Sequence, residues 1–129
     1  MLAIDTNVIV RYLTGDHPQQ SRKAKALIDS QHVFVCTTVL LETEWVLRSV
    51  YGFTPIKIAK ALSAFAGLSS VILEDPAIVA KALDWTAREM DFADALHLAK
   101  AQGLEAFMSF DRRLASAAKK LGDVKVRAP

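Results

Sequence analysis

The sequence predicts an α/β protein with three α/β/α layers around a parallel sheet of about five strands. Short apolar runs alternate along the chain with segments whose apolar residues recur at helical spacing. This alternation is typical of a parallel sheet that helices cover on both faces. We expect strands at residues 2–4, 33–36, 71–73, 106–108 and 124–126.

Three consecutive polar residues mark the passage from the first strand into a helix. Asp5, Thr6 and Asn7 follow the strand, and the apolar residues after them keep helical spacing. Each of these side chains can cap a helix by accepting a hydrogen bond from a free backbone N–H, but one cap is sufficient. The others remain for another role at the carboxyl edge of the sheet, where open α/β sheets bind ligands.

Later helices are bounded by proline at the start and glycine at the end. Thr54-Pro55 and Asp75-Pro76 each place a capping side chain before a proline that suits the first helical turn. Glycines are expected to end four helices, at Gly52, Gly67, Gly103 and Gly122. Apolar stripes are expected at Ile56, Ala59, Leu62 and Phe65, and at Ile78, Ala82, Trp85 and Met90.

Length and composition predict a single domain over residues 1–129, because 52% hydrophobic content can fill one core. The 16 basic and 14 acidic residues leave a net charge of +2, which does not by itself indicate a nucleic-acid binder. The single cysteine excludes an internal disulfide, and we expect no signal peptide before the first strand. No apolar run approaches the roughly 20 residues that cross a bilayer. We therefore expect a cytoplasmic protein without membrane association.

Four acidic residues lie where a strand passes into a helix or in the first turns of a helix: Asp5, Glu42, Asp94 and Asp111. Two carboxylates about 4 Å apart repel by roughly 4 kcal/mol at an effective dielectric near 20, so a cluster of four requires protonation or a bound cation. Carboxylate oxygens are hard ligands that suit Mg²⁺ or Mn²⁺. If the four converge, they form a divalent-metal site.

Each acid also has a structural explanation. Asp5 and Asp111 can act as helix caps, and Glu42 can interact favourably with its helix dipole. Asp91 and Asp94 are three residues apart and share a helical face, as in a capping box. We expect Asp94 to be the inward ligand and Asp91 to be a cap or an auxiliary residue.

Four segments together resemble the PIN domain, most closely the small toxin ribonucleases of the VapC type in toxin–antitoxin pairs. They are LAIDTNVIVRYL, TTVLLETEWVLRSVYG, DFADALHLAKAQG and FMSFDRRL, in the order of that family and across nearly the whole chain. The resemblance implies that the four acids converge on one or two Mg²⁺ or Mn²⁺ ions. It also implies a metal-dependent endoribonuclease that hydrolyses RNA phosphodiester bonds and inhibits translation.

The same resemblance implies supporting residues and partners. Thr6 or Asn7, and Ser109, match polar supporting positions of that site. Cations expected at the rim to contact RNA are Arg11, Arg112 and Arg113, with Arg48 and Lys100 as further candidates. The implied partners are an RNA substrate, a cognate antitoxin and a second copy in a homodimer. Four apolar residues are candidates for either protein interface or for the core: Trp45, Val50, Tyr51 and Phe53. Of these, we place Trp45 in the core.

The sequence argues against two other functions and leaves two alternatives. A phosphatase that forms an aspartyl-phosphate would want a second aspartate two residues after Asp5, where this chain has Asn7. A dinucleotide-binding domain would want a glycine-rich turn, but the first glycine is Gly15. A non-catalytic RNA- or protein-binding module and a solitary housekeeping nuclease are the remaining alternatives. Retention of all four acids argues against the binding module, because an unused cluster would keep its repulsion without benefit.

Overall fold

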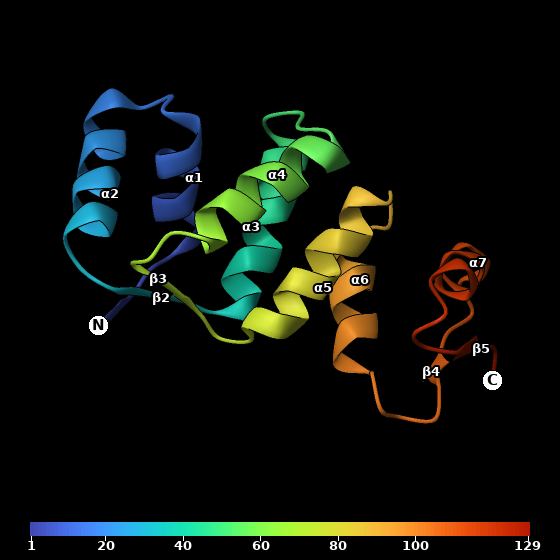
Figure 1. The fold of residues 1–129 in the computed structure, drawn as a ribbon. Helices are drawn as coiled ribbons and strands as arrows, with labels where there is room; N and C mark the ends of the chain where they lie inside the picture. Colours follow the sequence, from blue (N-terminus) through green and yellow to red (C-terminus); the bar gives the residue numbers. More distant parts are fainter. The chain divides into compact units, whose positions relative to one another are not determined.

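The computed structural model describes all 129 residues. They form two compact units, residues 1–76 and residues 77–129. In both units, parallel strands are connected through helices (Figure 1). None of the seven helices combines the length and the apolar character that crossing a bilayer would require.

The first unit contains a three-stranded parallel sheet in the order β1-β2-β3. The strands are β1 (Leu2–Ala3), β2 (Val33–Val35) and β3 (Val71–Leu73). Val33 lies opposite Leu2 on one side and Val71 on the other. The central strand β2 thus lies between two apolar neighbours, and its first and last residues, Val33 and Val35, are fully buried.

Four helices complete this unit: α1 (Thr6–Thr14), α2 (Pro18–Ser30), α3 (Thr37–Ser49) and α4 (Pro55–Ala66). Helix α1 packs against α2 and α3, and α4 packs against α3 and β3 (Figure 1). Their large fully buried side chains are Ile9, Ile28, Leu47, Ile58, Leu62 and Phe65. This packing holds the start of α1 beside the first turns of α3.

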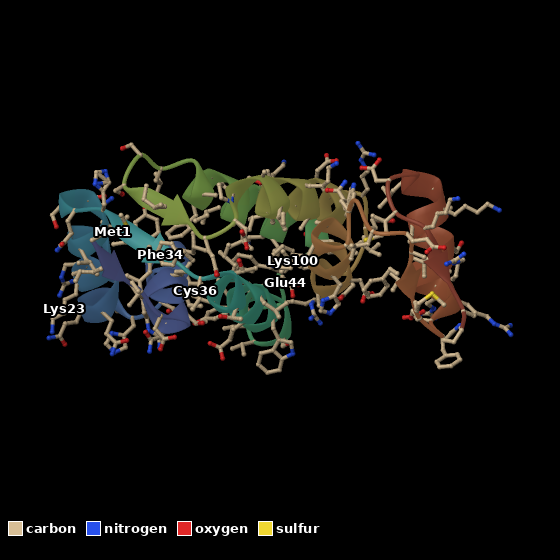
Figure 2. The ribbon with its side chains drawn as sticks, turned by 90° about the horizontal axis from the view of Figure 1, so that it is seen from below. Met1, Lys23, Phe34, Cys36, Glu44 and Lys100 are labelled. Atoms are coloured by element: carbon tan, nitrogen blue, oxygen red, sulfur yellow. The ribbon has the colours of Figure 1, made fainter.

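The amino end of α3 is capped by residues that follow β3. Cys36, at the junction of β2 and α3, makes no side-chain cap of its own (Figure 2). Instead, Glu74 Oε1 accepts a hydrogen bond from the backbone N of Thr37 at 2.8 Å, and Asp75 Oδ2 accepts one from Thr37 Oγ1 at 3.4 Å. The contact with Glu74 satisfies one backbone N–H of the helix that Cys36 leaves open, and the contact with Asp75 holds the side chain of Thr37.

The predicted stripe of α4 is confirmed at Ala59, Leu62 and Phe65 but wrong at Ile56, which is 53% exposed. Ile58 is fully buried in its place. At about 100° per residue, Ile56 and Phe65 point to opposite sides of the helix, whereas Ile58 and Phe65 nearly align. The core placement of Trp45 is also wrong, because this side chain on α3 is 55% exposed.

The second unit contains α5 (Pro76–Ala87), α6 (Phe92–Lys100), β4 (Phe107–Met108), α7 (Arg112–Leu121) and β5 (Val126–Arg127). Strands β4 and β5 are parallel and are joined through α7, which packs on β5. Ala82, Trp85 and Met90 are buried as predicted, whereas Ile78 is only half-buried and Val79 lies in the core.

The predicted α/β class with parallel strands is confirmed. The strands are shorter than expected and form one sheet of three and another of two. The last strand begins at Val126, two residues later than predicted. Glycine ends α4 at Gly67 and α7 at Gly122, where φ is 78°. The other two glycine predictions are wrong by about one turn or less, because α3 ends at Ser49 and α6 at Lys100.

Candidate functional site

Asp5 lies between β1 and α1 and caps the helix. Its Oδ1 accepts a hydrogen bond from the backbone N of Thr6 at 2.8 Å. The cap explains why the polar run begins where the strand ends. It also fixes the side chain at the carboxyl end of the sheet with Oδ2 outside the cap.

Thr6 and Glu42 connect the first turn of α1 with α3. Thr6 is buried, and its hydroxyl donates a hydrogen bond to Oε1 of the exposed Glu42. A hydroxyl held by the helix backbone restricts the rotamers of the long glutamate side chain. The structure therefore orders a carboxylate that would otherwise be free to move in solvent.

A cavity of about 360 Å³ lies at this place in the first unit. It brings together the predicted residues of this unit: Asp5, Thr6, Asn7, Arg11 and Glu42. The remaining lining is contributed by Val10, Val46, Val50 and Tyr51. The lining combines two carboxylates, which can attract a cation, with apolar side chains, which exclude part of the solvent.

Arg48, expected at the rim, contacts another acid. Its Nε lies 3.0 Å from Oε2 of Glu44, which is only 4% exposed and is labelled on α3 in Figure 2. A buried carboxylate requires such a partner. The ion pair gives Arg48 a structural role, one that was not predicted.

In the second unit, Asp91 and Asp94 occupy the start of α6 as the capping pattern predicted. Asp91 Oδ2 accepts a hydrogen bond from the backbone N of Asp94 at 3.1 Å. The pKa of Asp94 is raised, first by burial of its carboxyl and then by the negative charges of Asp91 and Asp111; His97 opposes this shift. Asp94 and Asp111 are thus electrostatic neighbours.

Asp111 caps α7 and receives support from Ser109. Its Oδ1 accepts from the backbone N of Arg113 at 2.9 Å and of Leu114 at 3.2 Å, while its own backbone N donates to Ser109 Oγ at 3.0 Å. Arg112 and Arg113 lie exposed in the first turn of α7. The predicted caps are confirmed, and the supporting serine contacts the predicted acid.

Each unit on its own holds two of the four predicted acids, Asp5 with Glu42 and Asp94 with Asp111. Neither unit by itself groups three His, Cys, Asp or Glu side chains in a way that could hold a metal ion. The donor chemistry nevertheless fits a hard divalent cation, because the predicted ligands are carboxylates and a cation would offset the charges of Asp91 and Asp111 that, after burial, raise the pKa of Asp94.

A polar network beside the cavity was missed from the sequence. Tyr51 Oη donates a hydrogen bond to Asp16 Oδ2 at 2.6 Å, and both residues contact Arg11. The sequence predicted Tyr51 only as an apolar residue of an interface or of the core. The pairing spans 35 residues, so no local spacing pattern announces it.

The fold and the site define a class of protein. It is an α/β protein that carries acidic side chains where strands pass into helices. The PIN domain family model matches residues 2–120, and the chain belongs to the PIN domain family. PIN domains are generally nucleases that typically use divalent metals. The match runs across both units, and a single domain over residues 1–129 stays a prediction. No curated protein matches the chain.

Proposed function

We propose that this PIN-domain nuclease is a Mg²⁺- or Mn²⁺-dependent endoribonuclease. Asp5, Glu42, Asp94 and Asp111 are its metal ligands and catalytic carboxylates. The observation that best supports this proposal is that Asp94 lies near enough to Asp91 and Asp111 for their charges to add to burial, which is the first cause of its raised pKa. A protein keeps such an arrangement where a cation binds or a proton is transferred.

The chain's own groups would divide the work. A divalent ion bound by these carboxylates neutralises their charge and makes water and phosphate more reactive. Thr6 holds Glu42 in one orientation, and Ser109 steadies the backbone of Asp111. Asn7 lines the cavity and offers an amide for a polar contact with RNA. Arg112 and Arg113 provide exposed positive charge for the RNA backbone.

We further propose that the nuclease is a cytoplasmic toxin that inhibits translation and is blocked by a cognate antitoxin. Exposed apolar residues support a protein partner, since Trp45 is 55% and Val50 is 67% exposed on α3 and at its end. The same surface is available for a homodimer. A short neighbouring reading frame encoding a DNA-binding antitoxin would support the toxin role, and its absence would favour a solitary housekeeping nuclease.

The test is cleavage of end-labelled single-stranded RNA by purified protein in buffers that contain Mg²⁺, Mn²⁺ or excess chelator. We expect internal cleavage with either metal and none with chelator. Restoration of activity when Mg²⁺ is returned is the control for irreversible damage. Cleavage that persists in chelator would contradict the metal assignment, and intact RNA under every condition would favour a non-catalytic binding module.

A further inference from the structure

The guanidinium of Arg11 is held by three neighbours beside the Asp5 and Glu42 cavity. Nε donates to Gln20 Oε1 at 2.8 Å. Nη1 donates to Asp16 Oδ1 and to Tyr51 Oη, both at 3.2 Å. Because these partners come from α2, from the α1–α2 connection and from the segment after α3, three parts of the chain fix one side chain.

Asp16 and Tyr51 also hold one another. Tyr51 Oη donates to Asp16 Oδ2 at 2.6 Å, and Thr14 Oγ1 donates to Asp16 Oδ1 at 2.8 Å. The hydrogen bond from Tyr51, then that from Thr14 and then the charge of Arg11 lower the pKa of Asp16. Asp16 therefore stays ionised at neutral pH and keeps the network closed.

The network leaves one nitrogen of Arg11 available. A guanidinium carries five N–H donors, and Nε and Nη1 account for three of them. The two donors of Nη2 have no protein partner. Arg11 lines the cavity of Asp5 and Glu42 and also a second cavity of about 270 Å³ between α1 and α2, where Lys23 adds another positive charge (Figure 2).

We propose that Arg11 binds a backbone phosphate of the RNA next to the cleavage site, and that Asp16 and Tyr51 are positioning residues that hold its guanidinium there. This inference rests on the proposed ribonuclease function. Arginine binds phosphate through planar, directed N–H groups, so a fixed orientation contributes register as well as attraction. An RNA chain that follows the two cavities would place successive phosphates near Arg11 and Lys23.

The test measures binding of a fluorescent single-stranded oligoribonucleotide with Mg²⁺ present, on an Asp111→Asn background in which we expect the RNA to stay intact. Arg11→Ala is expected to weaken binding about tenfold and to reduce the slope of log affinity against log salt by about 0.7. Tyr51→Phe is expected to weaken binding about threefold, since it removes only a positioning contact. Lys60→Ala, which removes an exposed cation from α4, is the matched control and should change neither quantity.

The double variant separates positioning from a general structural role. If Tyr51 acts through Arg11, Tyr51→Phe has no further effect once Arg11 is alanine. An equal loss with and without Arg11 would overturn the positioning role. Unchanged RNA binding and salt dependence in Arg11→Ala would overturn the phosphate site. That result is expected if Arg11 binds a carboxylate of a protein partner and not an RNA phosphate.

Failure of the proposed function would look different. Wild-type protein that never cleaves RNA, yet shows the expected binding losses, would overturn the nuclease activity and leave the phosphate site in place. If the wild type cleaves RNA with Mg²⁺ but Arg11→Ala binds RNA equally well, the nuclease activity stands and the phosphate site is overturned. Thermal unfolding midpoints of all variants provide the control for loss of fold.

Discussion

Thr6 donates its hydroxyl hydrogen to Glu42 Oε1 across 36 residues of sequence. The contact joins the first residue of α1 to a helix that begins after the next strand. Thr6 itself is only 6% exposed, so its hydroxyl has little access to water. One buried hydroxyl therefore orients a candidate catalytic carboxylate.

Replacing Thr6 tests this orientation. Thr6→Val keeps the volume but removes the donor, and we expect a fall in kcat of roughly tenfold or more because Glu42 loses a fixed position. Thr6→Ser keeps the donor and should retain most of the activity. Steady-state cleavage kinetics with Mg²⁺ measure both. Equal activity in the two variants would show that the hydroxyl contact does not matter for catalysis.

Asp5 and Asp111 combine capping with a proposed catalytic role, and asparagine separates the two. Asn accepts the same cap hydrogen bonds, so Asp5→Asn and Asp111→Asn should keep the thermal unfolding midpoint near that of the wild type while abolishing cleavage. Alanine at either position should also destabilise the fold by about 1 kcal/mol through loss of the cap. Full activity in both asparagine variants would contradict the residue assignment.

Asp94→Asn should stabilise the metal-free protein at neutral pH. Because the folded-state pKa of Asp94 is raised, the folded protein binds more protons than the unfolded chain between the two pKa values. Stability therefore falls as the pH rises through that window, and the penalty is fully present above it. Unfolding midpoints recorded with chelator should be higher for the variant at neutral pH.

The pH dependence provides the control for this prediction. The difference between Asp94→Asn and wild type should shrink in acid, below the ordinary aspartate pKa of about 3.9, where both forms are neutral. Added Mg²⁺ should raise the midpoint of the wild type more than that of the variant. A variant less stable than wild type at neutral pH would contradict the electrostatic explanation.

Two isoleucines on α4 form a matched pair for the core. Ile58 is fully buried, and Ile58→Ala should cost about 2–5 kcal/mol of unfolding free energy. Ile56 is 53% exposed, and Ile56→Ala should cost about 0.5 kcal/mol or less. Chemical denaturation with urea measures both. Similar losses at the two positions would contradict the orientation of this helix.

Much of this architecture could be predicted because local signals determine it. Proline begins α4 and α5, because the first helical turn does not need the N–H that proline lacks. Nearby aspartates satisfy the free backbone donors of three other helices, at Asp5, Asp91 and Asp111. Strand positions were predicted to within about two residues from their short apolar runs. The α4 stripe failed at Ile56 because repeated steps of three residues drift around a helix of 3.6 residues per turn, so that Ile56 and Phe65 point to opposite sides.

Contacts between distant residues could not be predicted in this way. The capping of α3 by Glu74, the network of Asp16 with Tyr51 and the pairing of Thr6 with Glu42 join residues at least 35 positions apart. Trp45 was misplaced because a large aromatic side chain suits a core and an interface equally well. Only packing of the whole unit decides such cases.

The caps described above bear on ion selectivity. In Asp5 and in Asp111 the oxygen Oδ1 is occupied by backbone N–H groups, which leaves mainly Oδ2 to offer to an ion. As the proposed metal ligands, such carboxylates would be monodentate, which suits a small octahedral cation that retains several waters. Calcium favours more oxygens and bidentate carboxylates. We therefore expect calcium to be a poor substitute for magnesium, a preference set by the same three hydrogen bonds that cap two helices.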